Sequence, residues 1–170
     1  MKAGIFMIFE HGKQSIKQKG FSLLDVIVAI FIVTVGLVAV STLVNSSLRA
    51  VSAAENKIIA SGLAQEGIET VRFLRGASGD WNAWFGSAST GDYRIQYNSS
   101  NLEPYADSFL LVDPAVSLYQ YTSGNPSIFK RKISITSVSS QEVVVKSIIT
   151  WADRGTSYSL EVEDRLWNWK

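Results

Sequence analysis

Residues 21–44 read FSLLDVIVAIFIVTVGLVAVSTLV, and this stretch decides the fold. Asp25 is its only charged residue, and no charge follows between Val26 and Leu48. About 20 such residues in a helix cross the core of a bilayer. Backbone groups in lipid have no water to bond, so a helix that closes its own hydrogen bonds is favoured there over a strand. The stretch therefore predicts one membrane-spanning helix over 21–48.

The first twenty residues are basic, and they predict the orientation of this span. A single glutamate stands there against four lysines, Lys2, Lys13, Lys17 and Lys19. Basic residues next to a span stay preferentially in the cytoplasm. We therefore expect a single pass through the cytoplasmic (inner) membrane, with a cytoplasmic N-terminus and an extracytoplasmic C-terminal part. The apolar run is too long for a secretory signal peptide.

Composition excludes several classes of function. After residue 20 the chain carries 14 acidic and 12 basic residues, a balance that does not favour binding to phosphates. We therefore expect no nucleic-acid partner. The chain has no cysteine, and its single histidine, His11, precedes the span. Thiolate and imidazole chemistry are thus missing from residues 21–170, and we expect neither a cofactor, nor a metal site, nor enzymatic activity.

Beyond the span an amphipathic helix is predicted. Its apolar residues recur at spacings of three and four: Ile59, Ala60, Leu63, Ala64, Gly67, Val71 and Leu74. The small residues 76–79, Gly-Ala-Ser-Gly, then favour a helix end. We therefore expect one helix from Phe21 to about Arg75, with 49–75 as its amphipathic second half, and a β-rich extracytoplasmic head over 76–170.

The last third of the chain predicts three antiparallel strands, over 129–138, 142–151 and 157–166. The third alternates apolar and polar residues, which is typical of a strand with one packed and one wet face. A turn with Gly155 at positive φ is expected to join the last two strands. Weaker strand signals lie at 93–97, 109–112 and 118–121. The expected fold class is α+β, with a long N-terminal helix packed on an antiparallel sheet.

Residues 17–30, KQKGFSLLDVIVAI, resemble the processing site of the type IV prepilin superfamily. The resemblance implies that a prepilin peptidase, which is also an N-methyltransferase, cuts between Gly20 and Phe21 and methylates Phe21. A residue without a side chain lets a peptidase approach the backbone closely. Residues 1–20 would then be a leader that its charge holds at the cytoplasmic face. The basic residues nearest the cut are Lys13, Lys17 and Lys19.

The resemblance also gives Asp25 a role in subunit assembly. It occupies the position where the family usually has a glutamate, whose carboxylate pairs with the N-terminal amine of a neighbouring subunit. The side chain is one methylene shorter here, which changes its reach. A lone carboxylate in lipid costs several kcal/mol unless it is paired, so we interpret Asp25 as a group that requires a partner within the membrane.

Looser similarity points to a subgroup. Residues 64–69, AQEGIE, and 151–155, WADRG, are similar to minor pilins and pseudopilins of the PilV and general-secretion I-type groups. Major pilins often carry a C-terminal disulfide loop, so the lack of cysteine favours the minor class. The resemblance thus implies a structural subunit of a type IV pilus or of a secretion or DNA-uptake pseudopilus. Its partners would be the prepilin peptidase, other pilin or pseudopilin subunits, an inner-membrane assembly platform and the lipid bilayer.

A different class of function stays open beside this one. The span alone would also suit a single-pass membrane anchor, with a head that recognises a ligand or partner without filament assembly. An enzyme is the third class of function, and it is disfavoured because residues 21–170 offer no convincing acid–base pair.

Two surface features of the head have competing interpretations. Trp81, Trp84 and Phe85, together with Trp167 and Trp169, could form a platform for glycans or a partner pilin, but packing in the core or between subunits is favoured. The run 130–132, Lys-Arg-Lys, could touch DNA. Because strand residues alternate faces, we expect a solvated edge strand instead.

Acidic residues of the head also have two interpretations. Glu161, Glu163 and Asp164 could be paired carboxylates or a calcium site, but the exposed face of a strand explains them better. Asp107 and Asp113 lie in predicted loops, without the dense run of oxygen ligands of an EF-hand.

Overall fold

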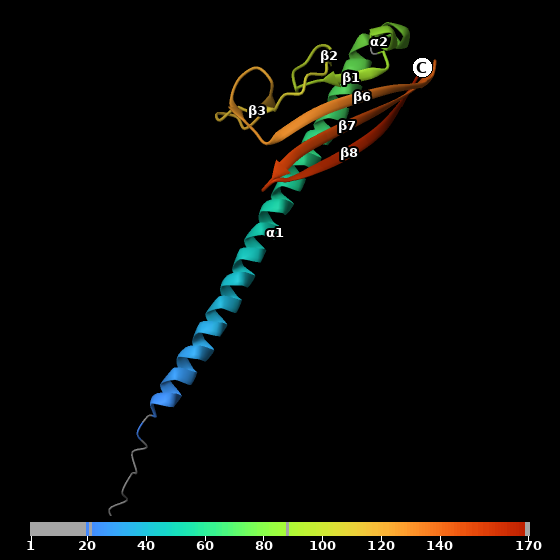
Figure 1. The fold of residues 1–170 in the computed structure, drawn as a ribbon. Helices are drawn as coiled ribbons and strands as arrows, with labels where there is room; N and C mark the ends of the chain where they lie inside the picture. Colours follow the sequence, from blue (N-terminus) through green and yellow to red (C-terminus); the bar gives the residue numbers. More distant parts are fainter. Residues whose placement is uncertain (1–19, 21, 88, 169–170) are drawn as a thin grey trace, which may run out of the picture. The chain divides into compact units, whose positions relative to one another are not determined.

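The computed structural model describes residues 20, 22–87 and 89–168, and the side chains of residues 86 and 87 are not considered. The chain divides into two units, Met1–Ser46 and Ser47–Lys170, and one long helix contributes to both. A helix followed by an antiparallel sheet makes the fold class α+β, as the sequence predicts (Figure 1).

Helix α1 spans Leu23–Ser78 and begins and ends close to the predicted limits. Its N-terminus is set by Ser22, whose backbone carbonyl accepts hydrogen bonds from the amides of Asp25 (2.9 Å) and Val26 (3.4 Å). At the other end Gly79 has a φ of 65°, a left-handed conformation that a glycine adopts without strain and that stops a helix.

A five-stranded antiparallel sheet forms the main part of the second unit, in the order β2-β1-β6-β7-β8. Strands β2 and β1 are short, whereas β6, β7 and β8 are long (Figure 1). The strands are β1 Gly91–Arg94, β2 Glu103–Pro104, β6 Phe129–Ser139, β7 Glu142–Asp153 and β8 Thr156–Trp167. The three predicted C-terminal strands are confirmed to within two residues at each end.

The turn between β7 and β8 confirms the predicted hairpin. Asp153 pairs with Thr156, which leaves Arg154 and Gly155 as a two-residue loop. Both loop residues have positive φ, 51° and 83°, as a type I′ turn requires. This turn fixes the register in which Trp151 pairs with Tyr158.

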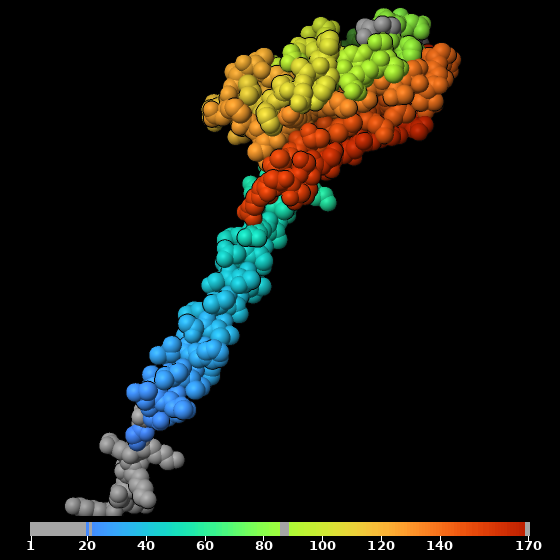
Figure 2. Space-filling view, viewed as in Figure 1, coloured from blue at the N-terminus to red at the C-terminus, as the bar shows by residue number. Residues whose placement is uncertain are grey.

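A second sheet of three very short strands has the order β4-β3-β5. Its strands are β3 Leu111–Val112, β4 Tyr119–Gln120 and β5 Asn125–Pro126. It is joined to the start of β6, because the Leu110 amide donates to the Phe129 carbonyl (2.8 Å). In Figure 2 the chain between β1 and β6, coloured yellow to gold, covers one end of the long orange and red strands.

A short helix, α2 Trp81–Ser87, is not predicted from the sequence. Asp80 provides its start, since its carboxylate accepts from the Asn82 amide (3.2 Å) and its carbonyl from the Trp84 amide (3.1 Å). Trp81 is anchored by its indole N–H, which donates to the Ser140 carbonyl (2.9 Å). The helix forms because two tryptophans are buried together, which a local pattern does not reveal.

The core lies between the second half of α1 and the inner face of the five-stranded sheet. All of the predicted apolar stripe is buried there except Ile59, which is half-buried. One cluster joins Ile68, Val71 and Leu74 to Ile133, Ile135, Val143, Val145 and Leu166, and to both tryptophans of α2. A second joins Ala60, Leu63 and Ala64 to Leu110, Phe129, Ile149 and Trp151.

The prediction that residues 130–132 belong to an edge strand is wrong. Strand β6 is central, with β1 on one side and β7 on the other. Lys130 and Lys132 point to the wet face, but Arg131 faces the helix and is almost fully buried. The alternation of faces was predicted correctly, and the burial of the arginine was not.

Candidate functional site

The N-terminal part of α1 exposes an apolar surface on every side. No side chain from 22 to 51 is buried, although almost all of them are apolar or small. Among the described helices α1 is long and apolar enough to cross a membrane, by length and composition. A helix that is apolar all round is normally surrounded by lipid or by other helices. This surface is therefore the first part of the candidate site.

The polar side chains of this apolar segment are satisfied within the helix. Five of them donate a hydrogen bond to a backbone carbonyl three or four residues earlier: Thr34, Ser41, Thr42, Asn45 and Ser46. Such bonds remove the need for water, which lowers the cost of placing these groups in lipid.

The predicted processing site lies directly before α1 and only partly within the described residues. Gly20 is exposed, and a Cβ atom added to it would meet nothing within 4 Å. Its backbone is therefore open to a protein partner. Phe21, the predicted site of methylation, lies outside the described residues, as do Lys13, Lys17 and Lys19.

Asp25 lies in the first turn of α1 and caps it. Its Oδ2 accepts a hydrogen bond from the backbone N–H of Ser22 at 3.2 Å. This is one half of a capping box, in which an acid three residues into the helix bonds back to the capping residue. The carboxylate also stabilises the positive end of the helix dipole. Asp25 thus has a role within the free chain that the sequence analysis did not assign.

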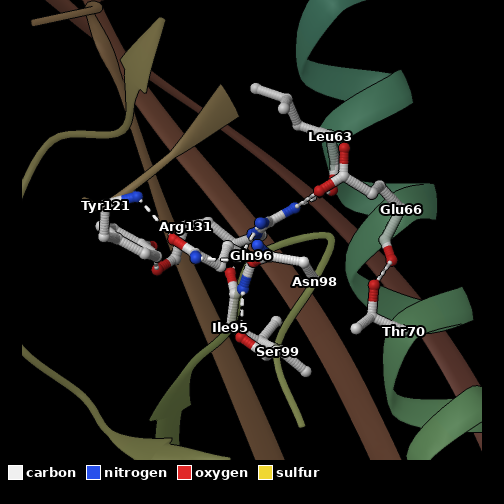
Figure 3. A network of polar contacts seen from close by, with 9 residues as sticks. All are labelled: Leu63, Glu66, Thr70, Ile95, Gln96, Asn98, Ser99, Tyr121 and Arg131. Atoms are coloured by element: carbon white, nitrogen blue, oxygen red, sulfur yellow. Dashed lines mark hydrogen bonds and ion pairs between the residues drawn. The ribbon is translucent and has the colours of Figure 1, made fainter. Parts of the chain in front are cut away.

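An ion pair with a fully buried guanidinium joins α1 to the sheet (Figure 3). Arg131 Nη1 lies 2.9 Å from Glu66 Oε1 and also donates to the Leu63 carbonyl at 3.1 Å. Its Nη2 donates to the Ile95 carbonyl at 2.6 Å. The Arg131 side chain is 0% exposed and that of Glu66 is 31% exposed. The guanidinium therefore links the helix, β6 and the segment after β1.

The same network continues to the loop after β1. Gln96 holds this loop, since its Oε1 accepts from the Tyr121 amide (2.7 Å) and its Nε2 donates to Asn98 Oδ1 (2.7 Å). The Tyr121 hydroxyl donates to the Arg131 carbonyl at 3.1 Å. Burial raises the pKa of Tyr121 above its usual value, despite the nearby guanidinium. Figure 3 shows these side chains converging beside β6.

The wet face of the sheet carries exposed ion pairs. Glu161 and Glu163 both face Lys146, with their carboxylates 2.6 Å and 3.5 Å from its Nζ. The predicted exposed face is thus confirmed for these two residues. Asp164 points inward instead and pairs with Arg72 at 2.8 Å.

The two loop aspartates do not come together. Asp107 pairs with Lys130 at 2.8 Å, and hydrogen bonds from Lys130 and Tyr105 lower the pKa of the Asp107 carboxyl. Asp113 accepts from the Ala115 amide within its own turn. Within the described part of the chain, no three acidic or histidine side chains are grouped so that they could hold a metal ion.

The proposed aromatic platform is not assembled. Trp81 and Trp84 are buried, with ring centroids 5.4 Å apart, and Phe85 stacks on Trp81 at 5.8 Å. Core packing, the favoured interpretation, is confirmed for these residues. Trp167 is half exposed at the end of β8, and Trp169 lies outside the described residues.

Comparisons with protein-family models, curated proteins and solved structures find no match for the chain.

The ion pair of Glu66 with Arg131 and the close packing at Gly67 were not predicted from the sequence. A Cβ on Gly67 would lie 2.5 Å from Ser147 Oγ and 2.9 Å from Ile133 Cδ1, so the glycine allows the sheet to approach the helix closely. A glycine inside an amphipathic helical pattern was the available signal, because it often marks close packing.

Proposed function

We propose that this protein is a prepilin-like structural subunit, a minor pilin or pseudopilin. It is processed after Gly20, methylated on Phe21, and assembled through the N-terminal part of α1 into a type IV pilus or a secretion or DNA-uptake pseudopilus. Before assembly it is a single-pass protein of the cytoplasmic membrane with an extracytoplasmic head. Its partners are the prepilin peptidase, other subunits of the filament and an inner-membrane assembly platform.

The observation that carries the proposal is the combination at the start of α1. The helix begins two residues after the predicted cut, its first turn holds a single carboxylate, and the apolar residues that follow are all uncovered. Lipid can cover such a surface in the precursor, and neighbouring helices of the same kind can cover it in a filament. The resemblance of residues 17–30 supplies the processing step.

The role of Asp25 follows from its position. A carboxylate at this depth is costly unless it is paired, and the capping bond to Ser22 satisfies only part of its hydrogen-bonding capacity. In the assembled state the charge pairs with the amine of a neighbouring subunit's Phe21 and fixes the axial register. The competing function, a membrane-anchored binding module, gives Asp25 no role beyond capping.

Variants of Asp25 separate these two roles. Asp25→Asn keeps an acceptor for the Ser22 amide but removes the charge, whereas Asp25→Ala removes both. Incorporation into filaments, measured by immunoblot of sheared filament fractions, is expected to be lost in both variants and to be retained in Asp25→Glu. Normal incorporation of Asp25→Asn would contradict charge pairing, and absence of the wild-type chain from the filament fraction would favour the anchor.

A further inference from the structure

Three adjoining hollows lie along the surface around the loop that follows β1. The first has a volume of about 350 Å³, the second about 100 Å³ and the third about 400 Å³. The first two share Gln96, Ser99 and Glu103, and the last two share Arg94 and Tyr121. The hollows adjoin one another, with the Arg94 guanidinium over the Tyr121 ring (5.4 Å to the ring centroid) between the second and the third, and we call the three together the Gln96 groove.

Neutral hydrogen-bonding groups dominate the first part of the Gln96 groove. Its lining is Gln96, Asn98, Ser99, Ser100, Asn101 and Glu103. Three of these are held in place, since Gln96 bonds Asn98 through its side chain and its amide donates to Ser99 Oγ at 3.0 Å. A pre-formed set of amides and hydroxyls lowers the entropy cost of binding a polar ligand.

The charges of the groove cancel. Arg94 and Glu103 lie 2.7 Å apart and are the only charged residues that line the three hollows in the described structure. No unpaired charge is left to select an acidic peptide, a basic peptide or a nucleic acid. The pairing therefore favours a neutral ligand.

The far end of the groove is apolar and partly aromatic. Phe109, Leu111, Tyr121 and Pro126 line the third hollow. Phe109 is 49% exposed, and the Lys130 ammonium lies over its ring at 4.8 Å from the centroid, so only the remaining part of the ring is open to a ligand. An extended peptide could not pair with β1, because both edges of β1 are already paired with β2 and β6.

We propose that the Gln96 groove binds a neutral oligosaccharide. Amide and hydroxyl side chains supply donors and acceptors for sugar hydroxyls, and the apolar end packs against the C–H face of a sugar ring. Side-chain amides suit this ligand because each offers an acceptor and two donors to neighbouring hydroxyls. The inference goes beyond the filament function and does not depend on it.

The test uses the full chain in lipid nanodiscs, since sugar-headed detergents would compete for the groove. Saturation-transfer NMR and calorimetry are carried out with maltotriose, cellotriose and triacetylchitotriose, with a trigalacturonate and a tetra-alanine peptide as comparators. Saturable binding of at least one neutral trisaccharide is expected, with neither comparator bound.

Two pairs of matched variants locate the binding. Asn101→Ala and Phe109→Ala are expected to weaken it about fivefold or more, the effect of one lost hydrogen bond or ring contact. The controls Asn82→Ala and Phe73→Ala remove an exposed amide and an exposed ring outside the groove and should change nothing. Absence of trisaccharide binding, binding of the peptide instead, or equal affinities in all four variants would each overturn the proposal.

Discussion

Glu66→Ala should destabilise the head far more than Glu69→Ala, although both remove one carboxylate from the same helix. Glu66 pairs with Arg131, whose side chain is 0% exposed, whereas Glu69 pairs with Arg72, whose side chain is 47% exposed. A buried charge that loses its partner is poorly solvated, and the loss is about 3–5 kcal/mol. An exposed pair contributes less than about 1 kcal/mol.

The expected value lies at the lower end of that range. Glu66 is 31% exposed, so water can enter the space that its carboxylate leaves and partly solvate the guanidinium. We therefore expect a loss of about 3 kcal/mol for Glu66→Ala, beside a change within about 1 kcal/mol for Glu69→Ala. The change in helix propensity is the same in both variants and cancels in the comparison.

Urea unfolding of the full chain in mild detergent measures this difference. All five tryptophans lie between residues 81 and 169, so their fluorescence reports the head and not the span. Adding Arg131→Met to Glu66→Ala removes the unpaired charge and should restore at least about 1 kcal/mol. Equal stabilities of the two alanine variants, or a further loss in the double variant, would refute the reasoning.

Two further predictions concern the same part of the molecule. Gly67→Ala should be about 1–3 kcal/mol less stable than Gly62→Ala in the same urea assay, because only the first adds a methyl group against the buried Ser147, while the gain in helix propensity is common to both. Equal stabilities would show that the packing relaxes freely. The raised pKa of Tyr121 means that the folded head holds the hydroxyl proton more tightly than the unfolded chain does. This difference therefore stabilises the folded head below about pH 10, and the stabilisation is lost as pH rises through the folded pKa. Thermal melts from pH 7 to 11 should therefore show a fall at the alkaline end that is smaller in Tyr121→Phe, and an identical fall in both would argue against it.

The parts of the fold that a local pattern controls could be predicted. The apolar run after Phe21 predicts a helix because a helix closes its own backbone hydrogen bonds, and α1 does begin at Leu23. Alternation and a single glycine predict the β7–β8 hairpin, since a two-residue turn with positive φ requires a residue such as Gly155.

The parts that depend on contacts between distant residues could not be predicted. Alternation places Arg131 and Lys130 on opposite faces of the sheet. It does not predict that the Arg131 guanidinium binds Glu66 and two backbone carbonyls on the inner face. In the same way, the pattern predicts packing of Trp81 but not the partner of its indole N–H, a carbonyl 59 residues away. These features arise from the pairing of helix and sheet, which the sequence pattern does not encode locally.

The intact mass of the chain, measured after co-expression with a prepilin peptidase, tests the proposed function most directly. If the proposed function is right, the mass of residues 1–20 is lost and one methyl group is gained on Phe21. Gly20→Ala is the control, because its added methyl group meets nothing within 4 Å and should block the cut without disturbing the fold. An unprocessed wild-type chain in the presence of an active peptidase, or equal cleavage of the wild-type and Gly20→Ala chains, would exclude the proposed processing site.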